Sequence, residues 1–184
     1  MFACWMRILK GVEGSVLWIA LNNETAISNV KAYAKEQGVD PGRLVIAGRT
    51  ATVEEHLARL PLADLFLDTY PYNAHTTATD AIRMGVPLLT LQGQSFASRV
   101  ASSVLMTVGL EALVTTTLEG YERLAIELGN APERLREIRR ALALEAPRSS
   151  LFNAVQYTKD LEQVFLDVYA LQTRKKAESL ATPV

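Results

Sequence analysis

Short, continuous apolar segments recur along residues 1–115, and a segment with helical spacing of its apolar positions follows each. The apolar segments are residues 15–21 (SVLWIAL), 43–48 (RLVIAG), 63–68 (ADLFLD) and 86–91 (VPLLTL), with a shorter one at 112–115. Apolar runs of this length are typical of strands that are covered on both faces. Such strands, alternating with helices, form a parallel sheet with helices on both sides. The sequence therefore predicts an α/β fold with a doubly wound parallel sheet.

The intervening segments predict helices, and the chain becomes mostly helical beyond residue 96. Gly38 and Gly85 follow two of the helical segments, as expected of helix C-caps. The helices are predicted at residues 2–11, 24–37, 53–60, 77–84, 97–108, 118–128, 131–144 and 150–172. We see no internal repeat or long linker, so we expect one domain over residues 1–172 and a polar, flexible tail over 173–184.

Charge and composition narrow the classes of function. The net charge is −1, and both signs are scattered along the chain, so neither nucleic acid nor a membrane surface is the expected partner. A single cysteine, Cys4, allows no internal disulfide, and two histidines without a cysteine or acidic cluster predict no metal site. Residues 1–7 lack the layout of a signal peptide, so we expect a cytoplasmic location.

The loop at residues 69–77 (TYPYNAHTT) leads from the third predicted strand into a helix. In open α/β sheets, ligands bind outside the carboxyl ends of the strands, where free N–H groups at helix starts favour anions. His75, Thr76 and Thr77 add side-chain donors, so this loop is a candidate diphosphate site. The spacing of Thr77 and Asp80 also fits a capping box, and both interpretations can be true together.

Two further loops occupy equivalent positions. After the second strand, Thr52 and Glu55 fit a capping box, and His56 and Arg59 share one helix face, where they suit a nucleobase and a phosphate or are ordinary surface charges. After the fourth strand, residues 92–99 place Gly93 before a helix, which suits a close backbone approach to a ligand. Neither a Walker sequence nor a GxSxG elbow occurs. Asp64 and Asp68 bracket the third strand, and we expect them only to end it.

Six stretches along the chain carry a more specific pattern. They are WMRILK (5–10), SVLW (15–18), EEHLAR (54–59), LADLFLDTYPYNAHTTATDAIRMGVPLLT (62–90), ASRVASSVL (97–105) and SLFNAVQYTKDLE (150–162). In order and over most of the chain, they resemble the C-terminal catalytic lobe of the protein O-GlcNAc transferases, the SPINDLY-related family of glycosyltransferases. The resemblance implies a Rossmann-like lobe of a GT-B architecture, which holds the nucleotide sugar and faces a second lobe across a cleft.

The resemblance also implies an activity: inverting transfer of N-acetylglucosamine from UDP-GlcNAc to Ser/Thr hydroxyls of proteins, without a metal or another cofactor. The helix at 150–172 would cross toward the other lobe. The donor-binding residues that it implies are Ala51 through its backbone at the uracil edge, His56 packed on the uracil, Arg59 beside the pocket, His75, Thr76 and Thr77 on the diphosphate, and Asp80 on the nucleotide side.

This chain also departs from the family pattern. Val53 stands where many relatives have a lysine, and relatives place a first strand, a glutamine and a catalytic lysine before the stretch WMRILK. We therefore expect the 184 residues alone to bind donor without transferring it, to depend on another lobe and helical repeats for protein acceptors, and to self-associate. The alternatives are a degenerate, non-enzymatic binding lobe, or a transferase that uses another nucleotide sugar such as GDP-fucose. His75 favours UDP-GlcNAc, because SPINDLY relatives that use GDP-fucose typically lack this histidine.

Overall fold

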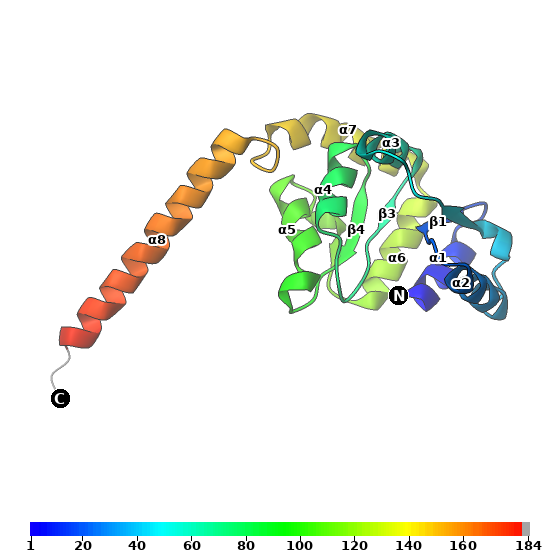
Figure 1. Ribbon diagram of the computed structural model, residues 1–184, viewed down its shortest axis with the longest axis horizontal. Helices are drawn as coiled ribbons and strands as arrows, with labels where there is room; N and C mark the ends of the chain where they lie inside the picture. The colour runs from blue at the N-terminus through cyan, green and yellow to red at the C-terminus, as the bar shows by residue number, and fades with distance from the viewer. Residues whose placement is uncertain (182–184) are drawn as a thin grey trace.

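The computed structural model describes the backbone of residues 1–181 and the side chains of residues 1–174. Strands and helices alternate along the first two thirds of the chain, as the sequence predicts (Figure 1). The strands are β1 (Leu17–Ala20), β2 (Leu44–Ala47), β3 (Phe66–Leu67), β4 (Leu88–Leu91) and β5 (Val114–Thr115). The helices are α1 (Phe2–Gly11), α2 (Glu24–Glu36), α3 (Val53–Arg59), α4 (Thr76–Arg83), α5 (Val100–Thr107), α6 (Leu118–Gly129), α7 (Pro132–Glu145) and α8 (Ala154–Ala181).

All strand pairs are parallel, which confirms the predicted sheet type, but the strands form two separate sheets. Strand β1 pairs with β2, with Leu17 opposite Leu44, and β4 lies between β3 and β5. The predicted glycine caps are also confirmed, because Gly38 and Gly85 both take positive φ angles, 72° and 73°.

Helix α1 packs against both groups of strands and so joins them. Met6 and Leu9 are buried in a cluster with Leu44 of β2, while Ile8 and Val12 are buried in a second cluster with β4 and α6. This arrangement uses two faces of one helix, each of which removes apolar surface from water.

The expectation that every strand is covered on both faces is correct for β4 and wrong for β1 and β2. All four residues of β4 are buried. In contrast, Val16, just before β1, is 56% exposed and Val45 of β2 is 42% exposed. The apolar run predicts a strand, but the helices that follow β1 and β2 leave part of this small sheet uncovered.

Helix α8 begins four residues later than predicted and continues to Ala181, projecting away from the α/β body (Figure 1). The predicted flexible tail, 173–184, overlaps the end of α8, and its last three residues lie outside the described residues. Its flexibility stays a prediction. None of the helices in the described part of the chain combines the length and apolar composition that crossing a membrane requires.

Candidate functional site

The start of α4 presents unpaired backbone donors at the carboxyl end of β3. His75 is the N-cap residue, and its carbonyl accepts the N–H groups of Ala78 and Thr79 at 3.1 and 3.2 Å. The N–H groups of Thr76 and Thr77 have no partner among the described residues, and both side chains are exposed. The capping-box interpretation is wrong, because α4 has no side-chain cap and Thr77 already lies within the helix.

The ring of His75 lies between two aromatic side chains. It stacks on Tyr72 with ring centres 4.9 Å apart and an interplanar angle of 18°, and it meets Phe96 edge-on at 6.1 Å. Phe96 is 82% exposed, so these rings lie at the surface. The Nε2 atom of His75 is covered and has no hydrogen-bond partner among the described residues. The two ring contacts therefore orient the imidazole, whose covered Nε2 atom is left without a hydrogen bond among the described residues.

The buried carboxylate of Asp68 is hydrogen-bonded to both ends of the loop at residues 69–74. Its Oδ1 atom accepts the N–H groups of Thr69 and Ala74 at 2.8 and 2.7 Å, and its Oδ2 atom accepts the Thr90 hydroxyl at 2.6 Å. Burial raises the pKa of Asp68, and these three hydrogen bonds oppose the rise by stabilising the charged form. The expectation that Asp68 only ends the strand, like the exposed Asp64, is therefore wrong. The available signal was an acidic residue at the carboxyl end of a buried strand.

Helix α3 carries the second group of predicted residues. Its capping box is confirmed in part, because the Thr52 hydroxyl accepts the N–H of Glu55 at 3.2 Å. The Glu55 carboxylate reaches past Thr52 and accepts the N–H of Ala51 at 2.9 Å. The backbone carbonyl of Ala51 has no partner among the described residues, and this residue is exposed. The backbone carbonyl of Ala51 can therefore accept a hydrogen bond from a ligand, whereas its N–H is already bonded to Glu55.

His56 and Arg59 lie on one face of α3, as their spacing predicts, and they contact each other. Nη2 of Arg59 lies 3.1 Å from Nδ1 of His56, and Nη1 donates to the carbonyl of Gly48 at 2.7 Å. The guanidinium also lies over the ring of Trp18, 5.6 Å from its centre. Arg59 is thus a fixed, half-buried group and not a freely solvated charge.

Gly93, in the third loop, is needed for packing within the protein. A Cβ atom there would lie 2.5 Å from the Ser98 hydroxyl and 2.9 Å from the Tyr70 ring. The close approach that the sequence suggests is therefore made by these two side chains, which hold the 69–77 and 92–99 loops together.

The seven predicted residues thus fall into two groups, at the starts of α3 and α4. Ala51, His56 and Arg59 follow β2, while His75, Thr76, Thr77 and Asp80 follow β3. Asp80 lies one turn after Thr76, on the same helix face and partly exposed. Both groups are at carboxyl ends of parallel strands, which is where α/β folds bind ligands.

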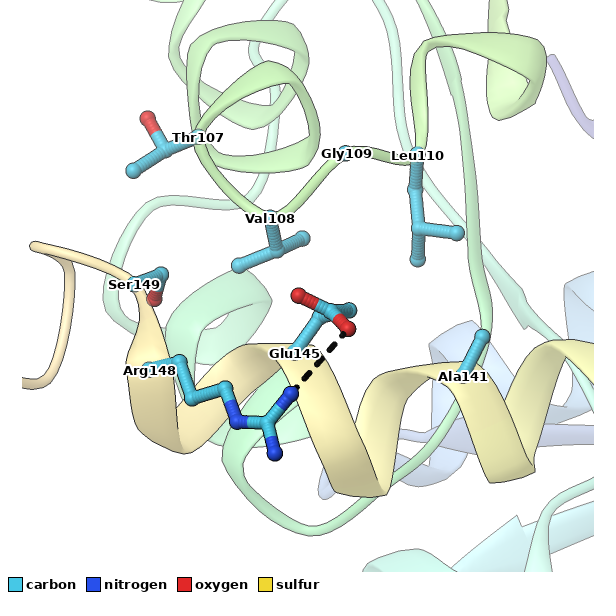
Figure 2. Close-up of a pocket in the computed structure, with 8 residues that line it drawn as sticks. All are labelled: Thr107, Val108, Gly109, Leu110, Ala141, Glu145, Arg148 and Ser149. Atoms are coloured by element: carbon cyan, nitrogen blue, oxygen red, sulfur yellow. Dashed lines mark ion pairs between the residues drawn. The ribbon is translucent and has the colours of Figure 1, made fainter.

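A separate cavity of about 350 Å³ lies between the end of α5 and helix α7 (Figure 2). It is lined by Thr107, Val108, Gly109, Leu110, Ala141, Glu145, Arg148 and Ser149. Its charged groups, Glu145 and Arg148, pair with each other at 3.8 Å and are both exposed. None of the seven predicted residues lines this cavity. Among the described residues, no three His, Cys, Asp or Glu side chains lie close enough together to hold a metal ion.

Comparison with known proteins assigns the fold and the family. The family model described as "Glycosyl transferase family 41" matches residues 1–161. Among solved structures, a mutant of the O-GlcNAc transferase of Thermobaculum terrenum superimposes with a TM-score of 0.84 at 30% identity. That match covers 98% of this chain and 34% of the other, and it confirms the predicted α/β Rossmann-like fold.

Two curated relatives are similar over most of this chain. The UDP-N-acetylglucosamine–peptide N-acetylglucosaminyltransferase of Caenorhabditis elegans is 36% identical over 160 residues, which cover 87% of this chain and 14% of the relative. An Arabidopsis thaliana protein described as a probable enzyme of the same name, SEC, is 33% identical over 168 residues, or 91% of this chain and 17% of the relative. The chain thus spans less than a fifth of the length of either protein.

Proposed function

The chain belongs to glycosyl transferase family 41, and we propose that it is the donor-binding lobe of a protein O-GlcNAc transferase. The proposed reaction moves N-acetylglucosamine from UDP-GlcNAc to Ser/Thr hydroxyls of proteins. The observation that carries the proposal is the start of α4, where Thr76 and Thr77 present unpaired N–H groups and exposed hydroxyls beside His75. A diphosphate carries the charge that such a helix start favours.

We assign the nucleoside to α3. The His56 ring has the flat, polarisable shape that stacks on uracil, and the free Ala51 carbonyl suits a ring N–H at the uracil edge. Arg59 would border this pocket and hold His56 in place. The Asp80 carboxylate, one turn along α4, suits the hydroxyls of the ribose, which are neutral donors.

The proposed chemistry is a direct displacement with inversion at the anomeric carbon. The acceptor oxygen bonds to that carbon, the bond to the UDP oxygen breaks, and the acceptor proton passes to a base supplied by another part of the protein. Negative charge grows on the departing diphosphate, so donors at α4 stabilise the transition state more than the bound substrate. Losing one such donor typically lowers the rate by about 10²–10³. We propose that these donors make a metal ion unnecessary, and transfer by the whole enzyme that stops in EDTA would contradict this.

The nucleotide assignment is tested by titrating UDP, UDP-GlcNAc and GDP into the 184-residue chain. We expect UDP and UDP-GlcNAc to bind, His75→Ala and Thr76→Val to weaken both, and no sugar transfer by this chain alone. Thr158→Val is the matched control, because it removes a hydroxyl from the projecting helix α8. Absence of UDP binding overturns the proposal, while preferential GDP binding supports a transferase of GDP-fucose type.

A degenerate binding lobe is the second candidate, and Val53 is the observation that favours it. Val53 is the first residue of α3 and is 68% exposed, so an apolar side chain stands beside the proposed nucleoside pocket. In that case, His75→Ala leaves the protein's interaction with its physiological partner unchanged. The protein acceptor and the cytoplasmic location expected from the sequence both stay predictions.

We also propose that the isolated chain self-associates. Strand β1 pairs only with β2 in the described structure, which leaves backbone donors and acceptors along its other edge. Helix α8 exposes several large apolar side chains, among them Val164 at 54% and Phe165 at 64%. Light scattering at increasing concentration tests this, and a constant monomer mass contradicts it.

A further inference from the structure

We propose that Asp68 is the positioning residue of the donor site: its buried carboxylate closes the 69–74 loop and thereby fixes the start of α4. This inference rests on the proposed function, because it assigns a role in UDP binding. Asp68 would not touch the donor and would act through Ala74 and His75.

The hydrogen bonds of Asp68 close the loop at both ends. One carboxylate oxygen accepts the N–H groups of Thr69 and Ala74, which are the first and last residues of the loop. The other oxygen accepts the Thr90 hydroxyl on β4. Ala74 directly precedes His75, the N-cap of α4, so its hydrogen bond fixes the chain at the point where the helix begins.

Buried polar groups concentrate under this one loop. Among the described residues, five polar or charged residues are buried: Asp68, Asn73, Thr90, Ser98 and Ser102. Three of them, Asp68, Asn73 and Thr90, belong to this loop or are hydrogen-bonded to the residue that closes it. Asn73 donates to the carbonyls of Thr69 and Leu91 at 2.8 and 3.3 Å, and its own N–H donates to Ala97. The Asn73 Oδ1 atom is covered and has no partner among the described residues, so these donated hydrogen bonds, with those of Asp68, are what restrict the loop to one conformation, as a preorganised binding site requires.

Asp68 is also the one fully buried charged residue in the described structure, with 0% exposure. A buried carboxylate is unfavourable unless its hydrogen bonds offset the loss of water. A neutral amide could close the same loop, because its oxygen accepts two N–H groups and its NH₂ donates to a Thr90 hydroxyl that has rotated. We therefore expect substitutions of Asp68 to be tolerated when the new side chain can still make the hydrogen bonds that close the loop, and not merely when it fills the same volume.

The test compares Asp68→Ala with Asp68→Asn by two measurements, UDP affinity and amide hydrogen exchange. We expect Asp68→Ala to raise the Kd for UDP by about 10- to 100-fold, because charged hydrogen bonds that hold the loop are removed. Exchange should accelerate in residues 69–75 and stay unchanged in α6. Asp68→Asn should restore both UDP affinity and exchange protection, which a role in packing alone does not predict.

Tyr121→Phe is the matched control. The Tyr121 hydroxyl donates to the backbone carbonyl of Asp68 at 2.9 Å, so this variant loses a buried hydrogen bond at the same residue without opening the loop. It should lower the Tm and leave the Kd for UDP unchanged. If Asp68→Ala fails to fold, Thr90→Val, which removes the donor to Oδ2 and keeps the shape, should weaken UDP binding and loosen the loop.

The outcomes separate this inference from the proposed function. If the wild type binds no UDP, the proposed function fails, and the exchange of residues 69–75 in the Asp68 variants still decides whether the carboxylate holds the loop. Wild-type UDP affinity in a folded Asp68→Ala or Thr90→Val variant overturns the positioning role. So does unchanged loop exchange in either variant.

Discussion

The guanidinium of Arg59 lies 3.1 Å from Nδ1 of His56, which determines how the imidazole can be protonated. Arginine has donors and no acceptor, so Nδ1 must accept this hydrogen bond. A neutral His56 ring therefore carries its proton on Nε2. Contacts of the same guanidinium with Gly48 and Trp18 keep it in place. The pair presents an oriented ring where we propose that uracil stacks.

The substitution Arg59→Ala should remove the hydrogen bond that orients the His56 ring. We expect neutral His56 to change from one tautomer to a mixture, because the donor to Nδ1 is gone, and the Kd for UDP to rise by about 3- to 10-fold. Nitrogen-15 NMR of the imidazole measures the tautomer, and calorimetry measures the affinity. Arg136→Ala, which removes an exposed arginine paired with Glu133 on α7, is the control. A tautomer mixture already present in the wild type would contradict the assignment.

Val53→Lys should strengthen UDP binding. Position 53 opens α3 and is 68% exposed, so a lysine has room to reach a bound nucleotide. A cation near an N-terminus costs the helix about 0.3–1 kcal/mol, so a small decrease in Tm should accompany the gain in affinity. Val155→Lys is the matched control, because Val155 is equally exposed on α8. Equal effects of the two lysines on UDP affinity would show only a general gain in charge.

Cys4 should resist thiol reagents in the folded protein. The side chain is 1% exposed, and burial, with a smaller contribution from the charge of Glu122, raises the pKa of its thiol to about 11. At pH 8, only about one thiol in 10³ would be ionised, and that thiolate is covered. Labelling should therefore follow unfolding and accelerate in urea. Rapid labelling of folded protein in buffer would show that α1 detaches from the body.

Asp68→Asn should gain stability relative to the wild type as the pH rises. Burial raises the pKa of Asp68 in the folded state above its value in the unfolded chain. The unfolded chain therefore releases this proton first, and the contribution of Asp68 to stability, complete below about pH 3, decreases as the pH passes through the folded-state pKa. The asparagine side chain does not titrate, so the stability of Asp68→Asn lacks this dependence on pH. Urea unfolding of both proteins between about pH 3 and 7 measures the difference, and a difference independent of pH would contradict the prediction.

Much of the candidate site could be predicted because its parts depend on neighbours in the chain. The spacing of Thr52 and Glu55 predicts their cap, and the spacing of His56 and Arg59 predicts that they meet, since residues three apart on a helix are neighbours. The spacing of Thr77 and Asp80 predicts a cap at Thr77 in the same way, but the N-cap is His75, two residues earlier, where the preceding loop turns into the helix.

The amino-acid sequence is enough to predict the order of strands and helices, the glycines that end helices, the loops at the carboxyl ends of the strands and, through its motifs, the family. These follow from periodicity and backbone preference, which act over a few residues. Three features emerge only when distant segments pack together: the strands form two sheets joined by α1, Asp68 is buried while Asp64 is exposed, and Trp18 lies under Arg59. Burial and long-range hydrogen bonds depend on which distant segments pack together, and two aspartates four residues apart carry no local signal that separates them.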